Sequence, residues 1–340
     1  MVYIKSATQI SAQQPLSEAW MTEPQILEGT YLRSQDPAFR EWLNPMESRR
    51  LGRLLKRALV TATEAMTSHQ SSLITHHSSL PDAIITGTGL GCIENTELLL
   101  NQMCREGDDT LKPTNFMQST HNTISSLIAI NSHCHGYNST YSHKAVSFDS
   151  ALLDAFLQLS LGDISTALVT GNDEMTPSYF TILQRAGYLG QPGQVPATEA
   201  SVAMMLSTKA DGALCELKDI QLTSHLSSLI AHHSSLPDAI LIGTNGCEAN
   251  DSVYEALADS SLFTHHSSLP IPLLHYKHLF GEGYCSSALG LYAAAHIVGK
   301  GAAPAFMRCD GKNEALPVSR LLVVNHSEGR CFSFVTLQKP

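Results

Sequence analysis

One phrase occurs twice in this chain and constrains its architecture more than any other feature. The copies span residues 68–84 and 224–240, and they lead into the similar segments PDAIITGTG and PDAILIGTN. A short apolar run that ends in a Gly-Thr turn is typical of a buried strand that delivers a loop to a site. The duplication therefore predicts two halves built on a common α/β plan.

The same repeats are rich in histidine, and a third, shorter copy begins at residue 264. A metal site needs ligands on a rigid frame with supporting hydrogen bonds, whereas these histidines stand in Ser-rich, turn-like segments. Surface loops are favoured over a metal centre, and we expect neither a metal nor another cofactor. The paired histidines are His76, His77, His232, His233, His265 and His266.

Charge and hydropathy exclude several classes of function. The chain has 340 residues and a net charge of −10, so it lacks the excess of Lys and Arg that a general nucleic-acid binder needs. No apolar run reaches the roughly 18 residues needed to cross a bilayer, and the first residues do not resemble a signal peptide. The eight cysteines form no CxxC motif. We expect a cytoplasmic protein with reduced, buried thiols and no membrane insertion.

The predicted elements alternate between strands and helices, as in an α/β protein. A helix is expected after the cap Asn44, running to about residue 66. Its polar face carries Arg50, Arg53, Lys56 and Arg57, either as a solvated surface or as a docking patch for an acidic carrier. The other expected helices span 94–106, 121–136, 151–163, 251–258 and 285–298. The expected strands span 83–88, 145–149, 166–174, 199–208, 214–221, 238–243, 271–275, 304–309, 320–325 and 331–338.

Six segments, in order, resemble motifs of the β-ketoacyl synthases, the condensing enzymes of fatty-acid and polyketide synthesis. They are AVSFDSALLDAF at 145–156, TALVTGNDEMTP at 166–177, EASVAMMLS at 199–207, ILIGTNGCEANDSVYEAL at 240–257, YKHLFGEGYCSSALGL at 276–291 and NHSEGRCFSFVTL at 325–337. The resemblance implies a thiolase-like fold with duplicated α-β-α-β-α layered halves and mixed, mostly parallel sheets. It places an N-terminal half at 1–210 and a C-terminal half at 211–340.

The resemblance also implies where the family's catalytic groups would stand. The cysteine that holds the acyl chain as a thioester corresponds to Leu152, and the two histidines that stabilise the enolate correspond to Ile242 and Glu282. Neither Leu152 nor Ile242 can attack a thioester or donate a hydrogen bond. Lys277 stands at the family's lysine. These positions are expected to form a vestigial site without catalysis.

The closing loop of the family corresponds to the segment that includes Ser327 and Gly329. Arg330 and Phe332 replace the glycine and asparagine of the family motif there. Family members that keep the fold but lack the nucleophile resemble chain-length factors, which pair with an active ketosynthase. The expected partners are therefore a ketosynthase and an acyl carrier protein, with aryl polyene synthesis as one candidate pathway.

Two alternatives stay open at this point. An active 3-oxoacyl synthase, acyltransferase or thioesterase would need another nucleophile and base, for which Ser150 and Glu282 are candidates. Cys134, Cys247 and Cys285 lie in neighbouring motif segments, although core packing is their ordinary role. The other alternative is a structural homodimer that binds no ligand.

Overall fold

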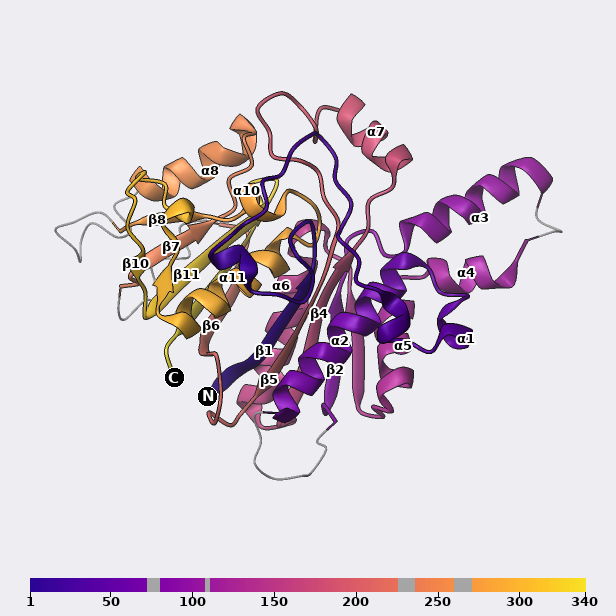
Figure 1. The fold of residues 1–340 in the computed structure, drawn as a ribbon, viewed down its shortest axis with the longest axis horizontal. Helices are drawn as coiled ribbons and strands as arrows, with labels where there is room; N and C mark the ends of the chain where they lie inside the picture. The colour runs from indigo at the N-terminus through magenta and orange to yellow at the C-terminus, as the bar shows by residue number, and fades with distance from the viewer. Residues whose placement is uncertain (72–79, 108–110, 226–235, 260–270) are drawn as a thin grey trace.

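The computed structural model describes residues 1–71, 80–107, 111–225, 236–259 and 271–340. Within these ranges ten strands form one continuous sheet, and two short strands, β9 (Ala302–Ala303) and β10 (Leu316–Pro317), form a separate pair (Figure 1). The strands of the large sheet are β1 (Val2–Ile10), β2 (Ala83–Gly87), β3 (Tyr137–Tyr141), β4 (Thr166–Asp173), β5 (Ala200–Ser207), β6 (Cys215–Thr223), β7 (Ala239–Ile242), β8 (Leu273–His275), β11 (Arg320–Ser327) and β12 (Cys331–Gln338).

The strand order confirms the predicted duplication. The sheet runs β3-β2-β4-β5-β1 and continues as β6-β12-β11-β7-β8, so the second five strands repeat the plan of the first five in mirror order. Strands β2 and β7, which follow the two long repeats, both lie second from an edge. The two halves meet where β1 pairs with β6 in antiparallel orientation.

The sheet is mixed, as expected, but parallel pairs do not predominate. Among the described strands, β2 pairs in parallel with β3 and β4, and β7 pairs in parallel with β8 and β11. The five other pairs in the sheet are antiparallel. A tight hairpin joins β11 to β12, and such a connection reverses the chain direction, so the inner strands of the second half cannot all be parallel.

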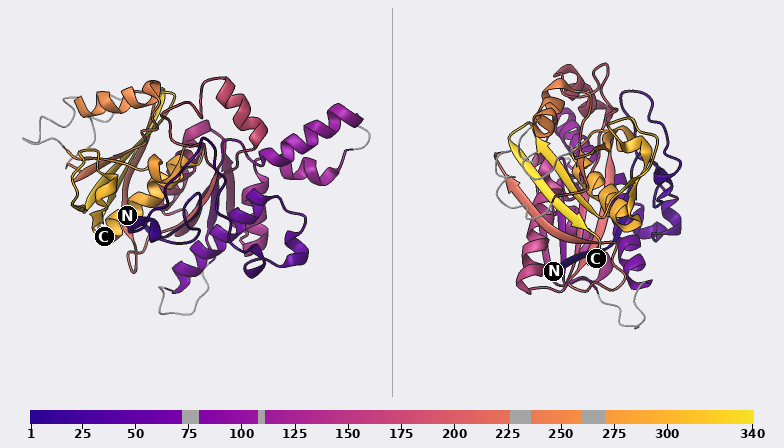
Figure 2. Two further views of the ribbon diagram at one scale, coloured as in Figure 1. Left: turned by 45° about the horizontal axis from the view of Figure 1, so that its top comes forward. Right: turned by 90° about the vertical axis from the view of Figure 1, so that its left-hand side faces the viewer.

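The helices in the described ranges are α1 (Pro45–Ser48), α2 (Arg53–Ser71), α3 (Ile93–Glu106), α4 (Pro113–Ser119), α5 (Thr123–Ser132), α6 (Ser147–Leu161), α7 (Pro177–Arg185), α8 (Glu248–Asp259), α10 (Lys277–Phe280) and α11 (Ser286–Lys300). Helices pack in three layers against the two halves of the sheet, whereas α3, α4 and α7 project beyond it (Figures 1 and 2). α2 and α5 cover the outer face of the first half, α8 covers the outer face of the second, and α6 and α11 lie between the halves.

The strands are apolar on both faces because each face is covered by helices. In β4, Ala167 and Val169 join the central cluster around α6 and α11, whereas Leu168 joins the outer cluster under α2. In β7, Leu241 points to the central cluster and Ile242 to the outer cluster beside α8. This double burial explains why the strands are continuous apolar runs in the sequence.

Two predicted strands are wrong. The segment 145–149 is a 3-10 turn at Lys144–Val146 that runs into α6, and the strand before it is β3. β3 was missed because its sequence YNSTY is polar and half-exposed at the edge of the sheet. The segment 304–309 contains a 3-10 turn at Ala305–Met307, where Pro304 precedes the turn and lacks the N–H that a ladder needs.

The predicted first helix is divided in two. The Asn44 side chain caps α1 by accepting a hydrogen bond from the Met46 N–H at 2.9 Å, as expected from the sequence. α1 then ends at Ser48, and the long amphipathic helix α2 begins at Arg53. β1, α4 and α7 were not anticipated from the sequence; β1 is nevertheless a central strand that contacts both halves.

The start of α6 lies very close to the end of β2. A Cβ atom at Gly87 would lie 2.4 Å from the backbone of Phe148, so only glycine permits this approach. This contact places the turn before α6 next to the carboxyl ends of the parallel strands. In α/β sheets, ligands bind at these carboxyl ends.

No helix in the described ranges is long and apolar enough to cross a membrane.

Candidate functional site

A pocket of about 380 Å³ lies where loops from both halves meet. The turn before α6, helix α7, the loop after β7, the α10–α11 segment and the β11–β12 hairpin all contribute to its wall. The lining residues are Lys144, Ala145, Tyr179, Leu183, Tyr188, Leu189, Asn245, Asn250, Lys277, Glu282, Gly283, Tyr284, His326, Ser327 and Glu328. Cysteine is absent from this set of described residues.

The turn between β3 and α6 delivers Lys144 and Ala145 to the pocket. Lys144 has a φ of 49°, an uncommon conformation for a residue with a side chain. The Ser147 hydroxyl stabilises the turn because it donates to the Lys144 carbonyl at 2.6 Å and accepts from the His143 N–H at 2.8 Å. At the start of α6 the wall therefore consists of an alanine methyl group and a lysine chain.

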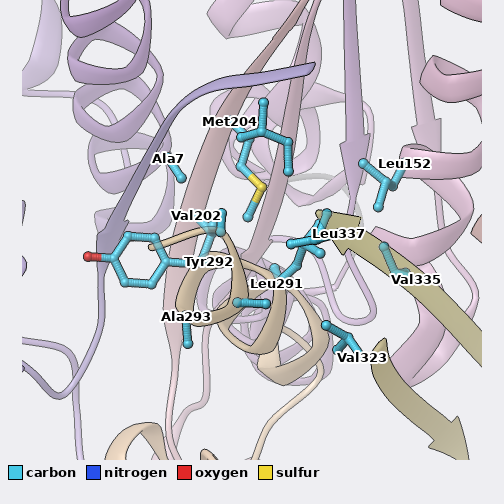
Figure 3. Close-up of a cluster of buried hydrophobic side chains, with 14 of the residues drawn as sticks. Ala7, Leu152, Val202, Met204, Leu291, Tyr292, Ala293, Val323, Val335 and Leu337 are labelled. Atoms are coloured by element: carbon cyan, nitrogen blue, oxygen red, sulfur yellow. The ribbon is translucent and has the colours of Figure 1, made fainter. Parts of the chain in front are cut away.

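Leu152 does not lie at the start of a helix, contrary to the sequence prediction. It occupies the second turn of α6, is fully buried, and packs in the central cluster. Figure 3 shows it beside Val335 and Leu337 of the second half. Because the segment 145–149 is a turn and helix rather than a strand, the chain enters the helix several residues earlier, at the Lys144–Val146 turn.

Ile242 also points away from the pocket. Its side chain belongs to the outer cluster with Tyr254 and Val324, between β7 and α8. The next residue, Gly243, faces the site, since a Cβ atom there would lie 2.8 Å from Cε of Lys277. The structure thus places Ile242 in the outer cluster and the backbone of Gly243 beside Lys277.

Lys277 and Glu282 lie side by side in the pocket wall. They are two of the four residues of the predicted vestigial site. Their Nζ and Oε2 atoms lie 2.6 Å apart, and the two side chains are 4% and 14% exposed. The Asn245 amide donates to the same carboxylate oxygen at 2.7 Å, and the Gly283 N–H donates to Oε1 at 3.0 Å. Asn245 was not anticipated as a site residue, although it follows the Gly-Thr turn.

Both oxygens of the Glu282 carboxylate are engaged, Oε2 by Lys277 and Asn245 and Oε1 by the Gly283 N–H. Its hydrogen bonds therefore go to the pocket wall and not to a nucleophile. Ser150, the proposed nucleophile, is not among the pocket-lining residues, and its hydroxyl donates to the Val146 carbonyl at 2.9 Å. The structure therefore does not assemble Ser150 and Glu282 into a nucleophile and base.

The β11–β12 hairpin closes one side of the pocket. Glu328 and Gly329 have φ values of 54° and 66°, and the Arg330 N–H donates to the Ser327 carbonyl at 3.1 Å. Positive φ at both central residues is characteristic of the tight turns that join antiparallel strands. Of the two predicted closing-loop residues, Ser327 lines the pocket and Gly329 supplies the turn.

His326 at the end of β11 is held as a neutral imidazole. Its Nε2 lies 3.1 Å from the Asn250 carbonyl and therefore donates, while Nδ1 accepts from the Gly329 N–H at 3.1 Å. Burial, and then the charge of Lys277, lower the pKa of His326 to about 4. The histidine thus ties the hairpin to the first turn of α8 and is uncharged at neutral pH.

Two of the four residues of the predicted basic docking patch are committed to internal ion pairs. Arg57 is fully buried, with its guanidinium 2.7 Å from Glu199, and Arg53 lies 2.7 Å from Asp36. Lys56 is half-buried over the ring of Phe39, and Arg50 is exposed. The burial of Arg57 was not predicted, because its acidic partners Glu174 and Glu199 lie far along the chain.

The other candidate groups do not form a site. Cys134 and Cys285 are buried and Cys247 is partly buried, and all are free thiols. No cluster of three metal-ligating side chains exists within the described ranges. The paired histidines of the three repeats lie outside the described residues, so their expected surface position stays a prediction.

Comparison with known proteins identifies the family. A profile of the β-ketoacyl synthase N-terminal domain matches residues 18–255. The chain belongs to the β-ketoacyl synthase family. No curated protein matches the sequence.

Solved structures with the same fold include two that are described as a ketosynthase with a chain length factor. The ishigamide ketosynthase/chain length factor has a TM-score of 0.80 at 16% identity, with 100% of this chain and 99% of that chain covered. The complex of ketosynthase ApeO with chain length factor ApeC from Xenorhabdus doucetiae has a TM-score of 0.70 at 14% identity, with 100% and 98% covered.

A further similar structure, AntDE:AntF, is described as a type II polyketide synthase acyl-carrier protein in complex with its ketosynthase bound to the hexaketide. Its TM-score is 0.78 at 11% identity, with 100% of this chain and 99% of that chain covered. At these identities the likeness establishes the fold, which is that of the thiolase-like ketosynthases.

Proposed function

We propose that this chain is a chain-length-factor-like subunit that pairs with an active ketosynthase and does not itself catalyse condensation. The observation that carries the proposal is the wall of the pocket at the start of α6. A condensing enzyme needs a thiolate there, whereas Ala145 and Lys144 occupy this place and no described lining residue is a cysteine.

The opposite wall is equally unsuited to decarboxylative condensation. An enolate oxygen needs preorganised N–H donors that remain available to the transition state. Lys277 and Asn245 do supply N–H donors, but both are engaged by Glu282. A carboxylate beside a developing enolate repels its charge, so this arrangement opposes the chemistry of the family.

An open sheet edge supports a protein partner. In the described sheet β3 pairs with β2 on one side, and its other side ends the strand order. Large apolar side chains are exposed on β3 and the adjacent helices α5 and α6, namely Tyr137 (43%), Ile130 (71%), Leu157 (49%) and Leu161 (75%). Exposed strand edges with apolar flanks favour association with another chain.

A ketosynthase is the partner that best fits this edge. Two similar structures are described as a ketosynthase with a chain length factor, and a third includes an acyl-carrier protein. By this analogy the heterodimer would act on acyl chains held by a carrier protein in polyketide or fatty-acid synthesis, with aryl polyene synthesis as a candidate pathway. A ligand-free homodimer and an independent acyltransferase remain the competing functions.

The test is co-expression with a ketosynthase from the same genome that retains the cysteine and both histidines. Gel filtration should give a one-to-one heterodimer, and Leu161→Glu should weaken it because the substitution puts a charge in the apolar contact. Ile26→Glu is the matched control, since Ile26 is 86% exposed in a loop distant from β3 in sequence. A stable homodimer that excludes the ketosynthase would contradict the proposal.

A further inference from the structure

A cysteine and a histidine meet beside the pocket, at residues that the sequence motifs do not connect. Sγ of Cys331, at the start of β12, lies 3.8 Å from Nε2 of His143, in the turn before α6. The two residues are 188 positions apart in the sequence. This contact is separate from the cluster around Lys277 and Glu282.

The hydrogen bonds of His143 determine which ring nitrogen carries the proton and which is free to accept the proton of the thiol. Nδ1 lies 3.4 Å from Oγ of Ser150, whose own proton is donated to the Val146 carbonyl. Ser150 can therefore only accept from Nδ1, which must carry the imidazole proton. Nε2 is left with its lone pair directed towards Cys331. A base oriented by a third group is the arrangement that activates a nucleophilic thiol.

The pair is accessible from solvent and lies next to the pocket. Cys331 is half-exposed and His143 is exposed. Cys331 pairs across the hairpin with Ser327, which lines the pocket, and His143 precedes Lys144, which also lines it. The side chains of Lys144 and Glu328 join the two segments through a 3.0 Å ion pair.

Other cysteines of the chain lack this combination of access and chemistry. Burial raises the pKa of the Cys92 and Cys215 thiols far above the usual range, so neither ionises readily. Burial, and then the charge of Asp310, raise the pKa of Cys309 to about 11. Cys104 is exposed on α3 and provides a reference for an ordinary surface thiol.

We infer that Cys331 and His143 form an acyl-accepting site. His143 takes the thiol proton, the thiolate of Cys331 attacks the carbonyl carbon of an acyl thioester, and the carbon–sulfur bond to the carrier breaks. The proton passes from His143 to the departing thiolate, so the products are an acyl-Cys331 thioester and a free carrier thiol. The choice of a thioester as donor rests on the proposed function, because that function places acyl thioesters at the adjacent pocket.

Nearby positive charge selects a donor with a phosphate-bearing arm. Arg330 is exposed immediately before the thiol, whereas the charge of Lys144 is offset by its ion pair with Glu328. Cations beside an approach path raise the local concentration of anionic substrates. An acyl-coenzyme A or acyl carrier protein should therefore react faster than a short neutral thioester.

The experiment uses the full chain alone with hexanoyl-coenzyme A and, separately, with the neutral hexanoyl thioester of N-acetylcysteamine. Intact-mass spectrometry with peptide mapping should find one acyl group, on Cys331. His143→Gln should slow its formation by about 100-fold, the usual contribution of a general base. Cys104→Ser, the matched control, should change nothing. Arg330→Gln should slow the coenzyme A reaction while sparing the neutral thioester.

The inference is overturned if no adduct forms, if the adduct lies on another cysteine, or if His143→Gln acylates at the wild-type rate. Circular dichroism of each variant shows whether it is folded; if His143→Gln is unfolded, His143→Asn and Ser150→Ala provide the same comparison. The ketosynthase is absent from this assay. Loss of acylation therefore leaves heterodimer formation unaffected, and failure to form a heterodimer leaves acylation measurable.

Discussion

Two cysteine substitutions, one in the turn before α6 and one within α6, test which residue lies in the pocket wall and which lies in the core. Ala145→Cys should place a thiol in the pocket, whereas Leu152→Cys should place one inside the central cluster. The second change replaces three carbon atoms of a fully buried side chain with one sulfur, a net loss of two non-hydrogen atoms. At about 0.8 kcal/mol for each atom lost plus a residual cavity, it should destabilise the protein by about 2 to 3 kcal/mol.

This loss can be measured as a melting temperature. Unfolding entropy of about 2.1 cal/mol/K per residue gives about 0.7 kcal/mol/K for a chain of 340 residues, so Leu152→Cys should lower Tm by about 3 to 4 °C. Ala145→Cys should change Tm by less than about 1 °C, because the added sulfur enters open space.

Alkylation with iodoacetamide, resolved by peptide mapping, is the second readout. The thiol of Ala145→Cys should react in the native protein, and that of Leu152→Cys only after denaturation. Wild-type protein treated in parallel supplies the background of its own cysteines. If the introduced thiol at 152 were alkylated as fast as that at 145, with no loss of stability, the placement of Ala145 in the pocket wall and of Leu152 in the core would be refuted.

Two further predictions concern buried charge and pH. Arg57→Ala leaves Glu199 buried without its 2.7 Å partner and should cost about 3 to 5 kcal/mol in chemical denaturation, whereas Arg50→Ala should cost less than about 0.5. Because the folded state lowers the pKa of His326 to about 4, it binds fewer protons than the unfolded state. Stability should fall as the pH drops from about 6.5 towards 4, and His326→Gln should flatten that decline; an unchanged slope would exclude this coupling.

Most of the fold was predictable because buried strands leave a continuous apolar signal. β4, β5 and β11 follow directly from such runs, and the repeats located β2 and β7 at equivalent places. β3 was missed because an edge strand needs no apolar alternation, and its polar residues instead match a loop. The division of the chain at residue 210 stays a prediction.

The sequence indicated which segments form the wall of the pocket, but not which residues of those segments face it. Motif spacing located the loop after β7 and the Lys277–Glu282 pair. It placed Leu152 at the start of a helix, whereas the 3-10 turn at Lys144–Val146 leads into α6 several residues earlier. The contact between Cys331 and His143 was not predictable, since it depends on a hairpin and a turn from different halves.

The most direct measurement of the central claim is a condensation assay with malonyl and acyl carrier protein substrates. It compares this chain alone, a partner ketosynthase alone, and the two chains purified together. The account predicts no product from this chain alone, and product of defined length from the pair. Carbon–carbon bond formation by this chain alone would contradict it.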